Sequence, residues 1–251
     1  MKNLKDKVVL VTGGASGIGL ATARRFASAG CRVAIGDIDG KAAIAAAREI
    51  VAAGGSAVGY RLDTRSESSW KKVIAQVQKK QGPLHVVVNN AGTGGAVPLA
   101  QTTLALWRKV NSVNTEGVFL GTKLGIAAIE KAGGGAIVNI SSIRGVTGYA
   151  GSSAYCASKA AVRLLSKVAA LECAQAKNGV RVNCVLPGYV ETPLVARNLT
   201  PARRKPLTQA TPMGRFAQPA EIADAIFYLA SPQASYITGT DLLVDGGYTA
   251  L

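Results

Sequence analysis

The stretch Lys7-Val-Val-Leu-Val-Thr12, followed at once by Gly13-Gly-Ala-Ser16-Gly17-Ile-Gly19, decides the fold of this chain. A short, continuous apolar run is typical of a strand that is covered on both faces. After the glycines, an amphipathic segment continues to Ala29 and stops before Gly30. A strand, a glycine turn and a helix in this order present backbone N–H groups and a helix N-terminus to a phosphate.

The following residues complete a unit of about thirty residues, the size of a dinucleotide-binding βαβ. Residues 31–36 read as a second strand, which ends on Asp37. A carboxylate at this distance from the glycine loop accepts hydrogen bonds from the adenosine ribose and repels a 2′-phosphate. Asp37 therefore predicts NAD rather than NADP, although an aspartate that only closes the turn before Asp39-Gly40 is the alternative. The glycine spacing is Gly-x-x-x-Gly-x-Gly and differs from GxGxxG.

The rest of the chain continues to alternate between strand and helix patterns. This alternation predicts one α/β domain over residues 1–251, a doubly wound parallel sheet of about seven strands with helices on both faces. Ligands of such sheets bind outside the carboxyl ends of the strands. The further strands are expected at 57–62, 85–89, 136–140, 180–185 and 241–245, and the helices at 41–53, 67–80, 153–177 and 219–229, with two helical stretches over 102–131 that break near Asn114 or Gly117.

A tyrosine and a lysine share one face of the proline-free segment 153–177. Ser152 or Ser153 can cap the start of this helix, and Tyr155 and Lys159 are four residues apart. A nearby ammonium lowers the pKa of a phenol, which would suit Tyr155 as a general acid or base. Ser142 follows a separate strand and could hydrogen-bond the same oxygen. Because such a pair also arises by chance, its placement at the predicted ligand edge is what favours function.

The composition argues against a membrane protein and against a protein held together by disulfides or metal ions. The sequence contains no apolar stretch of membrane-spanning length and no signal peptide, so we expect a cytoplasmic protein. The four cysteines lack CxxC or CxxH spacing, which favours free thiols over disulfides or a metal site. The only histidine, His85, begins a strand and is expected to be a structural or surface residue.

The formal net charge of +15 is typical of proteins that bind polyanions, but the placement of the basic residues along the chain is not. The basic residues are scattered, the densest cluster is Arg203-Arg204-Lys205, and no aromatic residues alternate with basic ones. We therefore expect neither a nucleic-acid nor a membrane partner, and interpret the charge as solvated surface with some attraction for an anionic cofactor or substrate.

Several ordered motifs now identify a family. In addition to the glycine loop, Ser142 and Tyr155-x-x-x-Lys159, the chain contains Asn89-Asn90-Ala91-Gly92, Asn114, Pro187-Gly188 with Thr192, and Val244-Asp245-Gly246-Gly247. Over residues 5–249 it resembles the short-chain dehydrogenases/reductases, a Rossmann-like family, and within it the bacterial NAD-dependent secondary-alcohol dehydrogenases.

The resemblance implies a role for each matching residue. Tyr155 would protonate a carbonyl oxygen, Ser142 would hold and polarise it, Lys159 would bind the nicotinamide ribose, and Asn114 would fix a water for proton relay. The glycines would admit the pyrophosphate, and later strand ends would hold the adenosine and the carboxamide. The full cofactor-binding set is Gly13, Ser16, Gly17, Ile18, Gly19, Asp37, Ile38, Asp63, Thr64, Asn90, Ala91, Gly92, Tyr155, Lys159, Pro187, Gly188, Val190 and Thr192.

The sequence identifies the substrate-binding residues less clearly than the cofactor-binding residues. We expect substrate contacts from Ser142, Arg144, Tyr149, Tyr155 and Tyr189. Arg144 would either meet an anionic substrate or point to the surface. The Pro- and Arg-containing segment 189–215 occupies the place of the family's substrate-covering loop and is expected to form a lid, and the resemblance implies a homotetramer.

Three functions are compatible with these residues. The first is hydride transfer between NAD(H) and a secondary alcohol or ketone. The second is reduction of 3-oxoacyl thioesters, in which Arg203, Arg204 and Lys205 would meet a carrier phosphate, although Asp37 argues against the NADPH that such reductases use. The third is a nucleotide-sensing protein without turnover, which the intact Asn114, Ser142, Tyr155 and Lys159 disfavour. The physiological substrate does not follow from the sequence.

Overall fold

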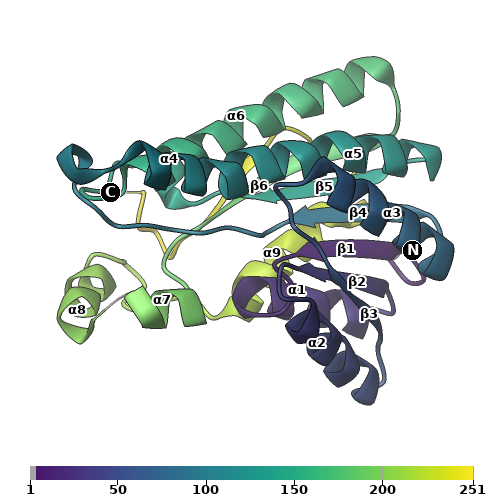
Figure 1. Ribbon diagram of the computed structural model, residues 1–251, viewed down its shortest axis with the longest axis horizontal. Helices are drawn as coiled ribbons and strands as arrows, with labels where there is room; N and C mark the ends of the chain where they lie inside the picture. Colours follow the sequence, from purple (N-terminus) through teal and green to yellow (C-terminus); the bar gives the residue numbers. More distant parts are fainter. Residues whose placement is uncertain (1–3, 199, 251) are drawn as a thin grey trace.

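The computed structural model describes residues 4–198 and 200–250, and these contain one seven-stranded sheet in which every strand pairs in parallel (Figure 1). The strand order is β3-β2-β1-β4-β5-β6-β7. The order reverses beside β1, which places a ligand crevice between the carboxyl ends of β1 and β4. The strands are β1 (Val8–Thr12), β2 (Arg32–Asp37), β3 (Ser56–Arg61), β4 (Leu84–Asn89), β5 (Gly135–Ile140), β6 (Val180–Pro187) and β7 (Asp241–Val244).

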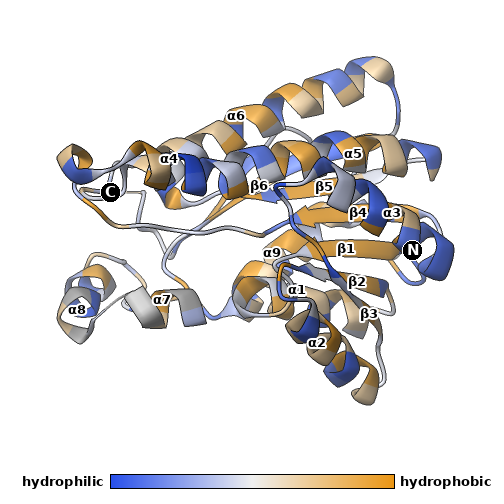
Figure 2. Ribbon diagram, viewed as in Figure 1, coloured by the Kyte–Doolittle hydropathy of each residue, from blue (hydrophilic) through white to orange (hydrophobic). Residues whose placement is uncertain are grey.

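Helices cover both faces of the sheet, as the alternating pattern predicted (Figure 1). One face packs against α1 (Gly17–Ser28), α2 (Gly40–Ala52) and α9 (Pro219–Ala230). The other face packs against α3 (Glu67–Gln81), α5 (Gly117–Lys131) and α6 (Ser153–Ala176). The central strands β1 and β4 are mostly apolar (Figure 2) because both of their faces are buried.

The break expected near Asn114 is a change in helix type. The helix α4 (Leu104–Asn111) passes into the π-helical turn η2 (Ser112–Glu116), and α5 begins at Gly117. A π-turn of this kind often lies at a functional site, because the widened turn re-aims a side chain. At the start of α6, Ser152 occupies the N-cap position but its side chain makes no capping hydrogen bond, contrary to the capping expected there.

A buried polar network fixes how α5 and α6 lie on the sheet. Asn89 at the end of β4 donates through Nδ2 to Asn139 Oδ1 of β5 at 2.8 Å. Asn139 in turn donates through Nδ2 to Ser166 Oγ of α6 at 2.9 Å. Since buried polar groups are costly without partners, this chain of hydrogen bonds specifies one arrangement of the layers.

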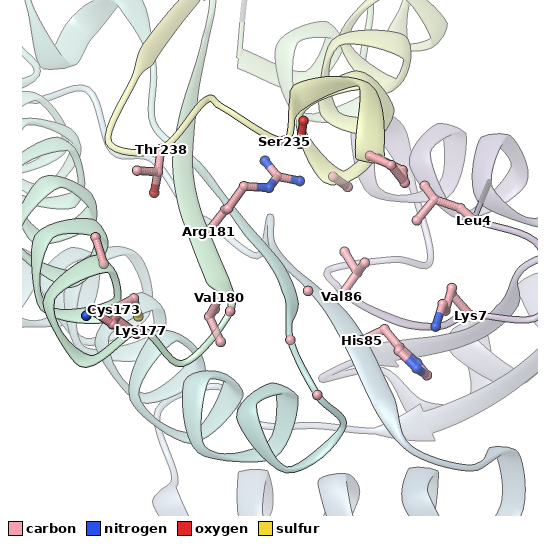
Figure 3. Close-up of a pocket in the computed structure, with 17 residues that line it drawn as sticks. Leu4, Lys7, His85, Val86, Cys173, Lys177, Val180, Arg181, Ser235 and Thr238 are labelled. Atoms are coloured by element: carbon pink, nitrogen blue, oxygen red, sulfur yellow. The ribbon is translucent and has the colours of Figure 1, made fainter. Parts of the chain in front are cut away.

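The opposite edge of the sheet, where the strands begin, holds a separate pocket of about 630 Å³ (Figure 3). His85 lies there, far from the carboxyl ends of the strands, and its Nδ1 accepts from the Val8 N–H at 3.3 Å. Arg181 donates to the carbonyl oxygens of Leu229 at 2.8 Å and Ser231 at 3.0 Å, and so satisfies the C-terminus of α9. These contacts serve the structure, as expected for His85.

Candidate active site

A cleft of about 680 Å³ opens at the carboxyl edge of the sheet. Its lining includes the ends of β1, β2, β4, β5 and β6 and the first turns of α1 and α6. Motifs that are far apart in the sequence therefore share one site. Of the predicted cofactor-binding residues, the cleft is lined by Gly13, Ser16, Gly17, Ile18, Asp37, Ile38, Asp63, Thr64, Asn90, Ala91, Gly92, Tyr155, Lys159, Pro187, Gly188, Val190 and Thr192.

The glycine loop needs its glycines for two different reasons. Gly13 and Gly17 have φ values of +60° and +52°, a region that other residues enter with strain. Gly19 instead lies beneath the loop, and a Cβ there would come within 2.1 Å of Gly13 O. The third glycine thus permits close packing, while α1 begins at Gly17 and turns its N-terminus toward the cleft.

Asp37 lies at the end of β2 with both carboxylate oxygens engaged. Its Oδ2 accepts from the Ala15 N–H of the glycine loop at 3.2 Å, and its Oδ1 accepts from the Asp39 N–H at 3.1 Å. The carboxylate is thereby held at the rim of the cleft, where it can still accept from a ribose hydroxyl, because each oxygen has a second lone pair. Asp37 can therefore both stabilise the turn after β2 and accept a hydrogen bond from a ribose.

The ends of β1 and β4 are joined by side chains. Asn90 donates through Nδ2 to Thr12 O at 2.9 Å, and its main-chain N–H donates to Thr12 Oγ1 at 3.0 Å. Beyond the end of the edge strand β3, Asp63 pairs with Arg65 at 2.7 Å, and this pairing lowers the pKa of the Asp63 carboxyl. The cradle for a dinucleotide is therefore pre-formed on rigid strand ends, and its residues fit such a cofactor.

Ser142 and Tyr155 both line the cleft. Ser142 Oγ accepts the main-chain N–H of Arg144 at 3.1 Å, which leaves the serine proton available for another oxygen. A hydrogen bond between Ser142 and Tyr155 stabilises the phenolate. Lys159 Nζ lies 5.8 Å from the centre of the Tyr155 ring and donates to Ile140 O at 2.8 Å.

The pKa of Tyr155 does not follow the expectation from the sequence. Burial raises it above its ordinary value, and the hydrogen bond with Ser142 and the charge of Arg144 only partly oppose that rise. Lys159 is itself buried, and the loss of water lowers its pKa to about 8. The lysine ammonium donates to a carbonyl of β5 rather than to the phenol.

Asn114 is fully buried in the π-turn and anchors the loop after β4. Its Oδ1 accepts from Thr93 N at 2.8 Å, and its Nδ2 donates to Thr93 O at 2.9 Å and to Ser158 Oγ at 3.0 Å. A Cβ on Gly92 would lie 3.4 Å from Asn114 Oδ1 and 3.5 Å from Lys159 Nζ. Asn114 and Lys159 therefore face the same small space, although Asn114 does not line the cleft.

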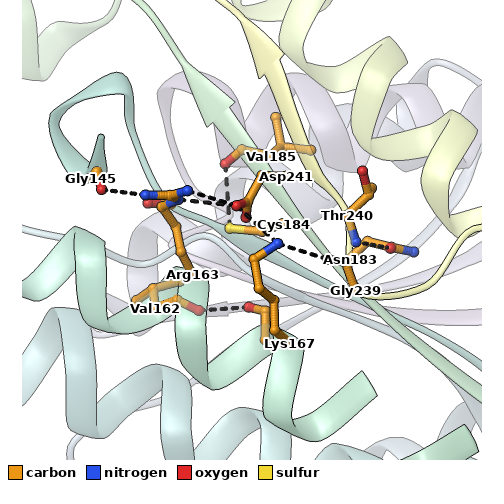
Figure 4. Close-up of polar contacts among 12 residues, drawn as sticks. Gly145, Val162, Arg163, Lys167, Asn183, Cys184, Val185, Gly239, Thr240 and Asp241 are labelled. Atoms are coloured by element: carbon orange, nitrogen blue, oxygen red, sulfur yellow. Dashed lines mark hydrogen bonds and ion pairs between the residues drawn. The ribbon is translucent and has the colours of Figure 1, made fainter. Parts of the chain in front are cut away.

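The loop that carries Ser142 is fastened to α6 at two points. Ser141 Oγ donates to Lys159 O at 2.7 Å, and Arg163 donates to Gly145 O at 2.7 Å. Arg163 and Lys167 also share Asp241 Oδ2 of β7, at 2.8 Å and 3.1 Å (Figure 4). The short helix η3 (Ile143–Gly145) is thus held against the helix of Tyr155 and Lys159.

The structure changes the interpretation of the other substrate-side residues. Arg144 is 8% exposed, so it does not point to the surface, and it does not line the cleft. Tyr149 and Tyr189 contact its guanidinium and are likewise absent from the lining. Their role as substrate contacts stays a prediction.

Several residues that line the cleft, among them Ser141, were not predicted from the sequence. Ser141, directly before Ser142, carries no motif signal apart from its adjacency, yet it lines the cleft and binds α6. The additional lining residues are Leu62, Arg65, Thr93, Val113, Ile140, Ser141, Pro193 and Val195.

Comparison with known proteins agrees with this geometry. Residues 13–249 match the family model described as Enoyl-(Acyl carrier protein) reductase. The chain is 44% identical to the 2,5-dichloro-2,5-cyclohexadiene-1,4-diol dehydrogenase LinX of Sphingobium indicum, covering 98% of this chain and 97% of that protein. It is 44% identical to the NADP-dependent (R)-specific alcohol dehydrogenase of Lentilactobacillus kefiri, covering 98% of both chains.

Two further similarities complete the comparison. Cyclopentanol dehydrogenase of Comamonas testosteroni is 40% identical, with full coverage of both chains. The crystal structure of a short-chain type dehydrogenase/reductase from Mycobacterium marinum superposes with a TM-score of 0.93 at 34% identity, covering 99% of this chain and 98% of that one. Within the described residues, no helix is long and apolar enough to cross a membrane.

Proposed function

The chain belongs to the short-chain dehydrogenase/reductase family, and we propose that it oxidises cyclic secondary alcohols to ketones, or reduces those ketones, with NAD(H). It is a dehydrogenase acting on CH–OH groups, as its relatives are. The observation that carries the proposal is that Ser142, Tyr155 and Lys159 line the same cleft as the glycine loop and Asp37. The cyclic class rests on the relatives named for cyclic alcohols and diols.

In the proposed mechanism the chain handles the proton. During oxidation the Tyr155 phenolate takes the proton of the substrate hydroxyl, while the Ser142 O–H donates to the same oxygen. In reduction the same proton returns from the Tyr155 hydroxyl. Lys159 would hold the ribose end of a bound cofactor, and Asn114 fixes the loop after β4 through Thr93. A bound nicotinamide cofactor supplies the hydride acceptor or donor.

The preference for NAD(H) is supported by Asp37. Its carboxylate is fixed at the rim of the cleft by two backbone N–H groups, and a negative charge there opposes a 2′-phosphate. One relative is named NADP-dependent, so the choice of cofactor requires a direct test.

Reduction of acyl thioesters is not favoured. Of the basic cluster expected to meet a carrier phosphate, Arg204 already pairs with Glu191 and lies over the Phe216 ring at 4.6 Å. Lys205 is exposed, and the Arg203 side chain lies outside the described residues. Intact acid–base residues in the cleft also leave no reason to prefer a sensor without turnover.

We further propose that segment 189–215 is a lid. It leaves and rejoins the body at one place, where Glu191 N donates to Ala217 O and Ala217 N donates to Tyr189 O, both at 2.9 Å. Between these points lie α7 (Pro193–Asn198) and α8 (Pro201–Gln209), beside rather than on the layered body (Figure 1). Met213 N, near the end of the segment, also donates to Gly246 O at 3.1 Å, so α7 and α8 are the part that can close over a substrate.

We propose a homotetramer in the cytoplasm. The α6 residues Leu164, Val168 and Leu171 are 67%, 52% and 63% exposed, and their spacing places them on one helix face. A second copy of this chain would cover that face, and Tyr236 and Leu243 near β7 offer a second one. The four cysteines remain free thiols, in keeping with a reducing compartment. Light scattering coupled to size exclusion tests the assembly.

The function is tested by initial rates of oxidation of cyclopentanol, cyclohexanol and a linear secondary alcohol with NAD and with NADP. Reduction of acetoacetyl-CoA with NADPH tests the alternative of acyl-thioester reduction. Tyr155→Phe should remove turnover by at least a thousandfold while NADH binding, followed by fluorescence, is retained. Tyr228→Phe, which removes the same atom from an exposed ring, should behave as wild type. Turnover surviving in Tyr155→Phe, or turnover of the thioester alone, would refute the proposal.

A further inference from the structure

A row of polar side chains lies along α6, and only its first half lines the cleft. Its members are spaced four residues apart, so each lies one turn beyond the one before it: Tyr155, Lys159, Arg163 and Lys167. Tyr155 and Lys159 line the cleft, whereas Arg163 and Lys167 do not. These two cations are only 25% and 40% exposed, and the proposed reaction uses neither of them.

Arg163 connects β7 to the loop that carries Ser142. Its Nη1 donates to Gly145 O at 2.7 Å, while its Nε and Nη2 donate to Asp241 Oδ2 at 3.2 Å and 2.8 Å (Figure 4). Gly145 is the last residue of η3, and its own N–H donates to Ser142 O at 2.8 Å. Two successive hydrogen bonds therefore lead from the guanidinium to the main chain of Ser142.

Asp241 orients this guanidinium through a single oxygen. Oδ2 accepts from Nε and Nη2 on one side of the arginine fork, which turns Nη1 away from the carboxylate and toward Gly145. The other oxygen, Oδ1, is buried and has no hydrogen-bond partner among the residues that the structure describes. A buried polar atom without a partner costs about 1–3 kcal/mol. The pair is thus not arranged for stability alone, and the direction of the arginine is what it secures.

The anchored loop lies tightly against α6. A Cβ on Gly145 would come within 2.8 Å of both Lys159 O and Ser141 Oγ. Ser141 Oγ donates to Lys159 O at 2.7 Å, so one fastening lies directly before Ser142 and the Gly145 fastening lies three residues after it. Because Ser142 is held between these two points, the loss of either one allows its hydroxyl to move relative to α6.

We propose that Arg163, oriented by Asp241, is a positioning residue of the dehydrogenase reaction, which fixes the Ser142 hydroxyl relative to Tyr155 by holding Gly145 against α6. This inference rests on the proposed function. Tyr155 and Arg163 belong to the same helix, so the arginine ties the serine loop to the element that carries the acid–base residue. Two groups that act on one oxygen require such fixed geometry, and a misplacement of about 1 Å can cost about a hundredfold in rate.

Lys167 provides a matched control. It shares Asp241 Oδ2 at 3.1 Å, but its other contact is Gly239 O at 3.0 Å, on the segment before β7 rather than on the serine loop. Replacing either cation by methionine removes one partner from the same carboxylate. Only Arg163→Met also releases Gly145, so the two variants separate the loss of an ion pair from the loss of the loop anchor.

The first measurement is kcat per NADH-binding site, with the number of sites taken from fluorescence titration so that unfolded protein does not count. Arg163→Met should lower this kcat by about tenfold, less than the full effect of misplacement because the Ser141 fastening remains, and should leave the Kd for NADH unchanged. Arg163→Lys, which keeps a donor for Gly145 O, should recover part of the loss. Lys167→Met should stay within about twofold of wild type.

A double-mutant cycle shows whether the arginine acts through the serine. In a Ser142→Ala background, measured in single turnovers at high enzyme concentration, Arg163→Met should cause no further loss, because the hydroxyl that it positions is gone. Losses that multiply in the double variant would refute the inference, and so would an unchanged kcat in Arg163→Met or an equal loss in Lys167→Met. Arg163→Gln, whose side chain is too short to bridge the two groups, decides in the same way if Arg163→Met does not fold. An inactive wild type, or an active Tyr155→Phe, would instead refute the proposed function.

Discussion

Replacing Lys159 by Met should make the folded protein more stable at neutral pH while removing its activity. Lys159 is 4% exposed, and burial lowers its pKa to about 8 from the ordinary 10.5. A lysine whose folded pKa lies below its unfolded pKa destabilises the folded state when it is protonated. That penalty is full below pH 8 and fades as the pH rises toward 10.5.

The magnitude follows from the two pKa values. The difference between 10.5 and about 8 corresponds to a penalty of about 3 kcal/mol at pH 7. Methionine has a similar length and no charge, but it loses the 2.8 Å hydrogen bond to Ile140 O, worth about 1.5–3 kcal/mol when the donor is charged. The net gain for Lys159→Met is therefore about 0.5–2 kcal/mol at pH 7, and at pH 9.5 it should have disappeared.

Urea unfolding at pH 7.0, 8.5 and 9.5, followed by circular dichroism, measures this difference in the free energy of unfolding. Lys72→Met is the matched control, because Lys72 is exposed and its charge is not buried on folding. Its free energy of unfolding should stay within about 0.5 kcal/mol of wild type at every pH. A Lys159→Met difference that does not change with pH, or a loss of stability at pH 7, would show that the buried ammonium is not penalised as argued.

Three further predictions follow from the cleft and the core. Asp37→Ala should raise the NADPH-to-NADH ratio of kcat/KM by roughly tenfold to a hundredfold, because repulsion of a 2′-phosphate is lost; an unchanged ratio in initial-rate assays would rule out that role. Gly19→Ala should abolish NADH binding measured by fluorescence, since its Cβ would lie 2.1 Å from Gly13 O, whereas Gly94→Ala, with no atom within 4 Å, should bind normally. Asn139→Ala should lower the free energy of unfolding by about 2–3 kcal/mol, because the side chains it joins on β4 and α6 lose a buried partner; a loss below 0.5 kcal/mol in urea unfolding would contradict this.

The sequence was sufficient for the parallel sheet, its flanking helices and the family. Short, valine-rich apolar runs bounded by glycine, such as Val8–Val11, favour strands buried on both faces, and the chain order of such units leaves few topologies. The glycine loop, Asp37 and Tyr155-x-x-x-Lys159 were identifiable because their chemistry depends on spacing along one element or one turn.

Only the tertiary structure decided the charge states and the substrate side. Burial lowers the pKa of Lys159 to about 8, and burial does not appear in the local spacing of Tyr155 and Lys159. Arg144 was expected at the surface or in the pocket, yet tyrosines from three segments enclose it. Burial depends on which distant residues pack together, so a sequence determines which groups are present, whereas the fold determines their solvation and therefore their pKa values.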